Sequence, residues 1–200
     1  MILEEKALYF SINRYRHADN RLLRRDFLKL GLIVTGAVLN PFSALATLNS
    51  SSKPLKNLAF FNTHTNERLH VCYSRNGKYD IKALSKINHI LRDHRSGEVK
   101  AIDTQLLELL YALSHKSNPQ IPFHVISGYR SPTTNKKLRK KNNGVASRSL
   151  HMQGKAIDIR IPGFKTWQLR NIARKMKVGG VGYYPKSDFV HVDIGRVRYW

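Results

Sequence analysis

The sequence predicts an α+β domain in which helices flank a small antiparallel sheet. Segments with apolar residues at helical spacing occur among shorter runs that read as strands, and turn residues separate them. No internal repeat is visible along the chain. The 200 residues, of which 42% are hydrophobic, are enough for one domain with an ordinary core behind a short leader.

The first half of this domain is predicted to contain two strands and then two helices. Residues 58–61 and 68–73 are rich in strand-forming side chains, and turns at 66–67 and 76–77 follow them. Asp80 is the expected N-cap of the first helix, whose apolar stripe comprises Ile81, Leu84, Ile87 and Leu91. Asp103 is the expected N-cap of the second, whose buried stripe comprises Leu106, Leu107, Leu110 and Leu113.

The second half is predicted to alternate strands with helices. A strand at 123–126 ends at Gly128, and Ser131 with Pro132 begins a basic helix that ends at 142–144. Residues 155–161 alternate in polarity and predict a strand, and 166–176 predict a helix with Trp167 in or near its buried face. Strands at 178–184 and 189–194 complete the domain.

The charge of the chain indicates an anionic partner. Lys and Arg number 35 against 13 Asp and Glu, which gives a formal net charge of +22. A nucleic acid, a membrane surface or a cell-wall polymer would suit this charge equally. The single cysteine, Cys72, excludes an intramolecular disulfide and a cysteine-rich zinc site, so a metal would depend on His and Asp.

An export signal is predicted at the start of the chain. Residues 23–29 match the twin-arginine pattern, residues 30–46 carry no charge, and 44–46 have the small-x-small form of a cleavage site. The prediction is a signal peptide at 1–46, a linker at 47–57 and a domain at 58–200. A membrane anchor is the alternative, but an uncharged stretch broken by Pro41 is short against the ~20 residues that a spanning helix needs.

This leader implies particular partners and excludes others. The twin-arginine translocation machinery would export the folded protein to the periplasm or cell envelope, without a permanent membrane anchor. Residues 47–200 keep 28 Lys and Arg against 9 Asp and Glu, so the exported part remains basic. No helix-turn-helix, RNA-binding or zinc-finger signature is present, and nucleic acid is therefore not the expected partner.

Two predicted strands and a loop could bring three metal-binding side chains together. Asp158 and His191 each lie between apolar residues in a strand, so each should project from the face opposite to the core. His151 would enter from the loop before the first of these strands, where Gly154 allows the backbone to turn. Two neutral imidazoles and one carboxylate suit Zn²⁺ with water in a fourth position.

Four separated motifs resemble one known family. They are Ser-Gly-Tyr-Arg-Ser-Pro at 127–132, Ser-x₃-His-x₂-Gly-x-Ala-x-Asp at 147–158, Val-Gly-Gly-Val-Gly-Tyr-Tyr-Pro at 178–185 and Asp-Phe-Val-His-Val-Asp-Ile-Gly at 188–195. The chain is similar here to the zinc D-Ala-D-Ala metallopeptidases, which share a superfamily with lysostaphin-type enzymes and hedgehog domains. More narrowly, it resembles the murein endopeptidase K type. The resemblance covers about residues 60–200 and implies a hedgehog/D-Ala-D-Ala peptidase-like zinc domain.

The resemblance also implies roles for individual residues. It makes His151, Asp158 and His191 the zinc ligands and Asp188 the general base. It makes Arg130 the cation that holds a substrate carbonyl or carboxylate. Some relatives have a histidine two residues before the last ligand, where this chain has Phe189.

The sequence leaves the base and the substrate contacts open. A regular strand would send Asp188 and His191 to opposite faces, so the assignment of Asp188 requires that it still lies in the turn. Asp193 shares a face with His191, and is either a competing base or the partner that orients the ring. Tyr129 and Tyr183, together with Tyr184, are candidate walls of a substrate groove.

The expected function is hydrolysis of peptide cross-links in peptidoglycan by zinc-activated water. A D,D-carboxypeptidase that trims terminal D-Ala is one alternative. A non-catalytic zinc domain that binds the cell wall is another. The sequence does not distinguish a bond between D-Ala and diaminopimelate from one between two diaminopimelates.

Overall fold

The computed structural model describes residues 54–141 and 144–200. The predicted signal peptide, most of the predicted linker and part of the turn at 142–144 lie outside these residues. Strand β1 begins at Lys56, inside the segment predicted to be a linker. Within the described residues, no helix is both long and apolar enough to cross a membrane.

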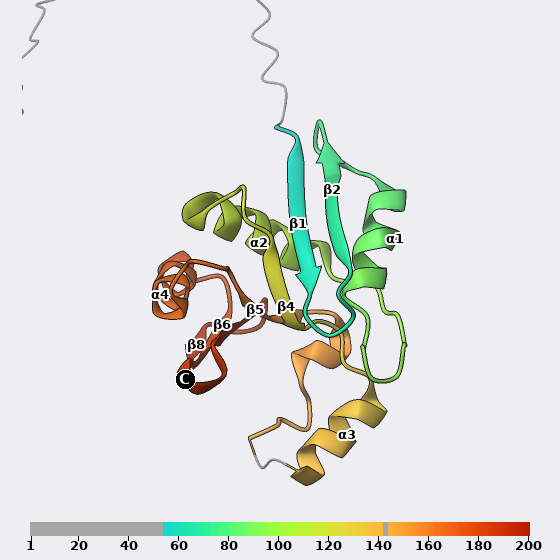
Figure 1. Cartoon of the computed structure of the whole chain (residues 1–200), viewed down its shortest axis with the longest axis vertical. Helices are drawn as coiled ribbons and strands as arrows, with labels where there is room; N and C mark the ends of the chain where they lie inside the picture. The colour runs from blue at the N-terminus through green and yellow to red at the C-terminus, as the bar shows by residue number, and fades with distance from the viewer. Residues whose placement is uncertain (1–53, 142–143) are drawn as a thin grey trace, which may run out of the picture. The chain divides into compact units, whose positions relative to one another are not determined.

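One eight-stranded sheet, in the order β3-β2-β1-β4-β5-β7-β6-β8, forms the centre of the domain (Figure 1). Its strands are β1 (Lys56–Asn62), β2 (Arg68–Arg75), β3 (Lys78–Tyr79), β4 (Phe123–Ser127), β5 (Ala156–Arg160), β6 (Gly180–Tyr184), β7 (Phe189–Asp193) and β8 (Arg198–Tyr199). The helices are α1 (Ile81–Ile90), α2 (Thr104–Ser117), α3 (Pro132–Lys141) and α4 (Thr166–Met176). Two short 3₁₀ helices are η1 (Leu150–Gln153) and η2 (Pro185–Ser187).

The α+β class is confirmed, and the sheet is larger than the predicted small one and mostly, but not entirely, antiparallel. The pairs β1/β4 and β6/β8 are parallel, and the remaining pairs are antiparallel. Strand β1 is followed by β2, β3, α1 and α2 before the chain returns beside it as β4, which permits the parallel pairing. The two-residue strands β3 and β8 extend the sheet beyond the predicted strands.

Alternation along the strands separates a core face from a functional face. Ile157 and Ile159 of β5 and Val190 and Val192 of β7 are buried in the hydrophobic core. The leucines predicted for the second helix, Leu106, Leu107, Leu110 and Leu113, are fully buried in the same core. The polar residues that alternate with the apolar ones along β5 and β7 therefore project from the opposite face of the sheet, as the sequence predicts.

The helix starts follow the predicted capping residues. Asp80 accepts a hydrogen bond from the backbone N–H of Ala83 (3.0 Å), and Asp103 accepts one from Gln105 (2.9 Å). Two side chains differ from prediction, since Ile81 is 81% exposed and Trp167 is 45% exposed. Both lie in the first turn of their helices, where a side chain can project past the edge of the core.

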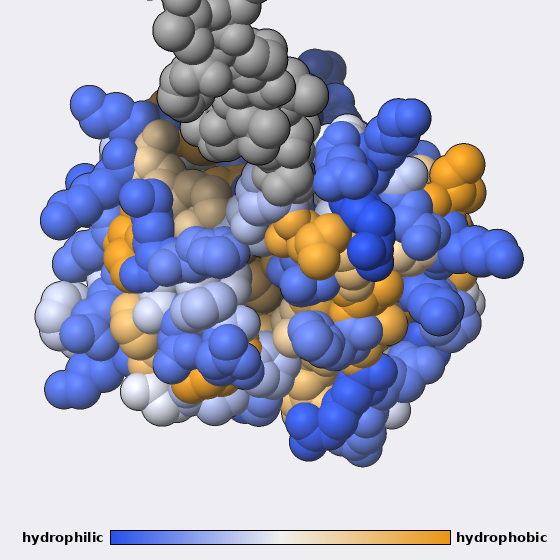
Figure 2. Space-filling model, turned by 90° about the horizontal axis from the view of Figure 1, so that it is seen from above, coloured by the Kyte–Doolittle hydropathy of each residue, from blue (hydrophilic) through white to orange (hydrophobic). Residues whose placement is uncertain are grey.

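Charged and other hydrophilic side chains dominate the face of the domain at which β1 begins (Figure 2). Viewed from the end of the domain where β1 begins, hydrophilic side chains cover most of the surface, and hydrophobic ones form separate patches (Figure 2). This pattern fits a domain whose apolar residues are mainly used in its core.

A buried carboxylate fixes the loop between β4 and α3. Asp93 is 1% exposed and accepts hydrogen bonds from the backbone N–H groups of Ser131 (2.9 Å) and Arg95 (2.9 Å). The N–H of Tyr129 donates to the carbonyl of Leu91 in the same region (2.7 Å). The loop that carries Arg130 is thus held against the segment after α1.

We expect Asp93→Ala to lower the free energy of unfolding by about 2–3 kcal/mol, because buried N–H groups lose their acceptor. Burial alone would raise the pKa of Asp93, but hydrogen bonds from Thr134, Ser131 and Arg95 hold it below the ordinary 3.8. The stabilisation should therefore be complete above that ordinary pKa and be lost as the pH falls further. Urea unfolding across this pH range measures both effects, and a variant as stable as the wild type at neutral pH would contradict the assignment.

Candidate metal centre

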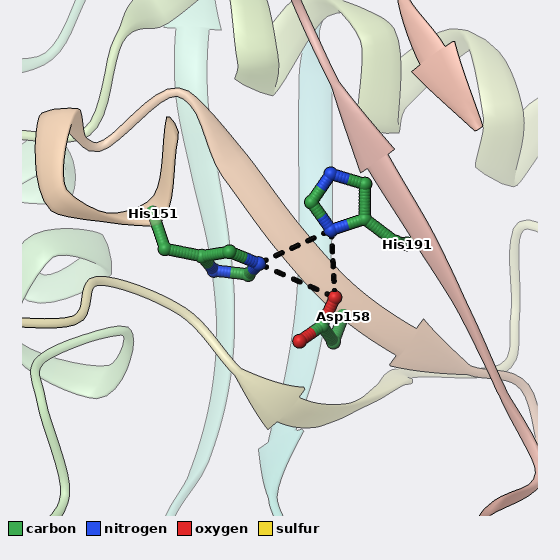
Figure 3. Close-up of side chains that lie close together, drawn as sticks. All are labelled: His151, Asp158 and His191. Carbon is green, nitrogen blue, oxygen red and sulfur yellow. Dashed lines mark hydrogen bonds and ion pairs between the residues drawn. The ribbon is translucent and has the colours of Figure 1, made fainter. Parts of the chain in front are cut away.

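Three side chains that are distant in the sequence meet on the functional face of the sheet. His151 Nε2, His191 Nδ1 and Asp158 Oδ1 lie close together (Figure 3). The two nitrogens are 3.1 Å apart, and Asp158 Oδ1 lies 3.3 Å from His151 and 2.9 Å from His191. All three residues are buried. The three predicted metal ligands are therefore together in space.

The register of the sheet and one short helix produce this meeting. Asp158 of β5 and His191 of β7 are direct partners in the antiparallel pair, so their side chains project side by side. His151 lies in η1, which ends at Gly154 in a left-handed conformation (φ 68°) before β5 begins. This turn directs the His151 ring toward the strand that follows it (Figure 3).

The partners of the two rings leave one free nitrogen on each of them. His151 Nδ1 lies 2.7 Å from the carbonyl oxygen of Gly128, which can only accept, so this nitrogen carries the proton. His191 Nε2 lies 2.9 Å from Asp193 Oδ2 and donates to it in the tautomer that leaves Nδ1 without a proton. The unprotonated His151 Nε2 and His191 Nδ1 then face each other and Asp158 Oδ1. Three electron pairs directed at one point favour a cation between them.

The donor set fits zinc in type, size and support. Bonds of about 2.0–2.1 Å in a tetrahedral site place ligand atoms roughly 3.3 Å apart, close to the separations found here. Histidines that bind a metal commonly donate their other N–H to a carbonyl or a carboxylate, as both do in this protein.

Charges around the cluster keep Asp158 ionised. Burial alone would raise its pKa, but His151 and His191 outweigh this effect and hold the pKa well below its usual value. Burial would likewise lower the pKa of His191, but the neighbouring carboxylates of Asp158 and Asp193 raise it overall. Arg130 Nη2 lies 3.6 Å from Asp158 Oδ2 and adds a positive charge beside the second carboxylate oxygen.

A cavity of about 650 Å³ gives access to the cluster. Arg130 and Arg148 are among the cationic residues that line it, and Tyr184, Phe189 and Trp200 are its aromatic ones. Asp158 is the one acidic side chain among the described residues that line this cavity. The cavity could therefore hold a peptide that carries negative charge.

The structure does not bring Asp188 to the metal cluster. Its backbone is left-handed (φ 49°) after η2, which takes its side chain out of the alternation of β7. Asp188 Oδ1 accepts from Thr166 Oγ1 (3.2 Å), and Oδ2 lies 3.6 Å from Arg160 Nη1. The carboxylate lines a neighbouring cavity of about 530 Å³ instead. The turn conformation expected for Asp188 is present, but it directs the side chain toward α4.

Asp193 has the geometry of a residue that orients His191. Its side chain is fully buried, and besides His191 it accepts from Arg198 and from the backbone N–H groups of Gly180 and Gly195. These hydrogen bonds outweigh burial and hold its pKa below the usual range. A carboxylate this enclosed cannot contact a substrate.

The predicted aromatic walls are partly replaced by other residues. Tyr129 is 7% exposed and Tyr183 packs against Arg170, and neither lines the metal cavity. Tyr184 does line it, together with Phe189 and Trp200. The alternation of side chains along a strand explains this difference. Tyr184 pairs with Phe189, and Phe189 lies on the same face of β7 as His191. Tyr184, rather than Tyr183, is therefore on the side of the metal ligands.

Comparison with known proteins gives a consistent result. Residues 50–200 match a family model described as "Peptidoglycan L,D-endopeptidase MepK". The chain is 41% identical over 177 residues to Peptidoglycan L,D-endopeptidase MepK of Escherichia coli K12, covering 88% of this chain and 96% of that protein. It is 39% identical over 180 residues to Probable peptidoglycan L,D-endopeptidase MepK of Haemophilus influenzae, covering 88% and 95%.

One solved structure shows a weaker likeness. The L-Ala D-Glu endopeptidase ChiX of Serratia marcescens aligns with a TM-score of 0.33 and 18% sequence identity, over 48% of this chain and 68% of that one. A likeness at this level does not establish a shared fold.

Proposed function

Because the chain belongs to the family of peptidoglycan L,D-endopeptidases represented by MepK, we propose that it hydrolyses peptide cross-links of peptidoglycan at a zinc centre. The observation that supports this most directly is the convergence of His151, Asp158 and His191 with free ligand atoms directed at one point. The basic charge of the chain suits a substrate that carries carboxylates.

The proposed roles follow from position in the cavity. His151, Asp158 and His191 would hold the zinc, which when bound polarises a carbonyl and makes water more acidic. Arg130 has a side chain that is 13% exposed, and its charge is directed at the cavity beside Asp158. A fixed, desolvated cation of this kind stabilises negative charge that develops on a carbonyl oxygen, or binds a substrate carboxylate.

The bond between two diaminopimelate residues is the proposed target. The relatives are named L,D-endopeptidases, and such a bond joins an L centre to a D centre. The bond between D-Ala and diaminopimelate joins two D centres. This proposal selects one of the two cross-links that the sequence alone leaves open.

Muropeptide analysis tests the function. Zinc-loaded protein should convert purified dimers linked through two diaminopimelates into monomers, and a chelator should abolish the conversion. Dimers linked through D-Ala serve as the matched substrate and should remain largely intact. If the only product were peptides shortened by a terminal D-Ala, the protein would be a carboxypeptidase, and intact substrates with zinc retained would indicate a binding domain.

We expect Asp188→Asn to retain most of the activity, which tests its role as general base. Loss of a general base costs roughly 10²–10⁴-fold in rate, whereas a residue in the neighbouring cavity should change turnover by less than about threefold. Steady-state cleavage of the dimer measures this effect. A loss above a hundredfold with zinc retained would restore Asp188 as the base, and would mean that its side chain leaves Arg160 and Thr166 when substrate binds.

The place of action follows from the predicted leader. We propose export by the twin-arginine machinery to the periplasm, because Arg24 and Arg25 precede an uncharged segment and a cleavage-like site. Peptidoglycan lies in that compartment, so export and substrate agree. Replacing both arginines by lysine should leave the protein in the cytoplasm, and fractionation followed by mass spectrometry of the N-terminus would measure this and the cleavage.

A further inference from the structure

A wall of aromatic side chains stands beside the metal ligands. The ring of Trp200 lies 5.2 Å from the ring of His191, centroid to centroid. Trp200 Nε1 donates a hydrogen bond to the hydroxyl of Tyr184 (2.8 Å), and Tyr184 stacks on Phe189 at 4.5 Å and 18°. We call Tyr184, Phe189 and Trp200 the aromatic wall. All three line the metal cavity.

Arg198 joins this wall to the residue that orients His191. Its guanidinium lies 4.9 Å from the centroid of the Trp200 ring and contacts both oxygens of Asp193, at 3.1 and 2.7 Å. Asp193 in turn accepts from His191 Nε2. The contacts therefore form a closed circuit, from Trp200 through Arg198 and Asp193 to His191 and back to Trp200.

Two glycines of β6 make room for this arrangement. A Cβ atom added at Gly182 would lie 2.6 Å from Cε2 of Trp200, and one added at Gly180 would lie 2.5 Å from Nη1 of Arg198. The parallel pairing of β6 with β8 places the two segments side by side. The two glycines of the Gly-x-Gly sequence in the motif at 178–185 thus leave space for the side chains of Arg198 and Trp200.

We propose that Trp200 is a positioning residue for the metal ligand His191, and that the aromatic wall it completes binds the acidic peptide substrate. The substrate part of this inference depends on the proposed function, whereas the part concerning His191 does not. Peptide stems would pack their aliphatic portions against the rings, while their carboxylates face Arg130 and Arg148 across the cavity.

Fluorescence tests the link to the metal ligand without any catalysis. The chain contains two tryptophans, so Trp167→Phe leaves Trp200 as the sole emitter. We expect zinc added to chelator-treated Trp167→Phe protein to change the emission with the stoichiometry of metal binding. The matched variant, Trp200→Phe, keeps only Trp167 on α4, and its emission should not respond. Unchanged Trp200 emission, while a competing chelating dye reports zinc binding, would overturn the role beside His191.

Substitutions test the wall itself. We expect Trp200→Ala to weaken zinc binding roughly tenfold, as removal of a supporting partner does, and to raise KM for the peptide dimer more than it lowers kcat. Gly182→Ala should displace the Trp200 ring while the sequence of residues 198–200 is unchanged. It should therefore also weaken zinc binding and raise KM. Trp200→Phe keeps an aromatic face and should have the smaller effect.

The outcomes separate this inference from the proposed function. Normal zinc affinity and normal KM in a folded Trp200→Ala protein, checked by thermal unfolding, would refute the inference. A wild-type protein that cleaves neither dimer would refute the proposed function and, with it, the substrate role of the wall. The fluorescence response to zinc would still decide whether Trp200 positions His191.

Discussion

Asp158→Asn should fail to retain zinc on dialysis, and it should cleave the peptide dimer at least about 10²-fold more slowly than the wild type. A loss of this size exceeds the roughly 10–100-fold effect of removing a residue that only supports a metal ligand. Asp158 is the one charged member of the donor set, and both imidazoles and Arg130 contact it. An amide removes the negative charge, and its NH₂ group would direct hydrogens at atoms that need a cation.

Metal analysis after dialysis and dimer cleavage measure the two effects in parallel. Asp188→Asn is the matched control, because it makes the same chemical change in the adjacent cavity and should keep both zinc and activity. A zinc content equal to that of the wild type in Asp158→Asn would contradict the assigned ligand set. Zinc loss without loss of cleavage would show that the metal is structural.

The second large effect is expected for Asp193→Ala. This change leaves Arg198 without its carboxylate and His191 without the acceptor that fixes its ring. The backbone N–H groups of Gly180 and Gly195 also lose their acceptor, so the free energy of unfolding should fall by about 2–3 kcal/mol, and loss of a supporting hydrogen bond weakens metal binding roughly 10–100-fold. Both losses should appear in one variant because one side chain serves both contacts.

Urea unfolding of the zinc-free protein measures the change in the free energy of unfolding. Competition with a chelating dye measures the change in zinc affinity. Asp193→Asn is the matched variant, since its amide oxygen can still accept from His191 or Arg198, and it should fall between wild type and alanine. If Asp193→Ala kept the zinc affinity of the wild type, the orientation of His191 would have to depend on other contacts, with Trp200 the first candidate.

Local signals in the sequence predicted much of this site. Alternation around Asp158 and His191 placed both side chains opposite the core, and the structure pairs them directly. Asp80 and Asp103 mark helix starts because their side chains satisfy free N–H groups, a requirement that depends only on neighbours in the chain. The bounds of α4, Thr166–Met176, agree with the predicted helix.

Features that depend on long-range pairing could not be predicted. Strand β8 has two residues, too few to show a period, and its parallel pairing with β6 arises from the fold. Asp188 was expected in a turn, but no sequence pattern indicates that a left-handed residue there would direct its carboxylate to Thr166 and Arg160. Its position in the motif suggested the role of general base. Its contacts instead connect it to Arg160 of β5 and Thr166 of α4.

The pairing of β6 with β8 has a consequence for metal exchange. Strand β8 is a two-residue strand at the edge of the sheet, and Trp200, which follows it, places its ring beside His191. A short edge strand has few hydrogen bonds to lose, so it can open locally while the interior of the sheet stays folded. Such an opening would uncover His191 without unfolding the domain, and the rate of metal exchange would then follow the stability of this edge.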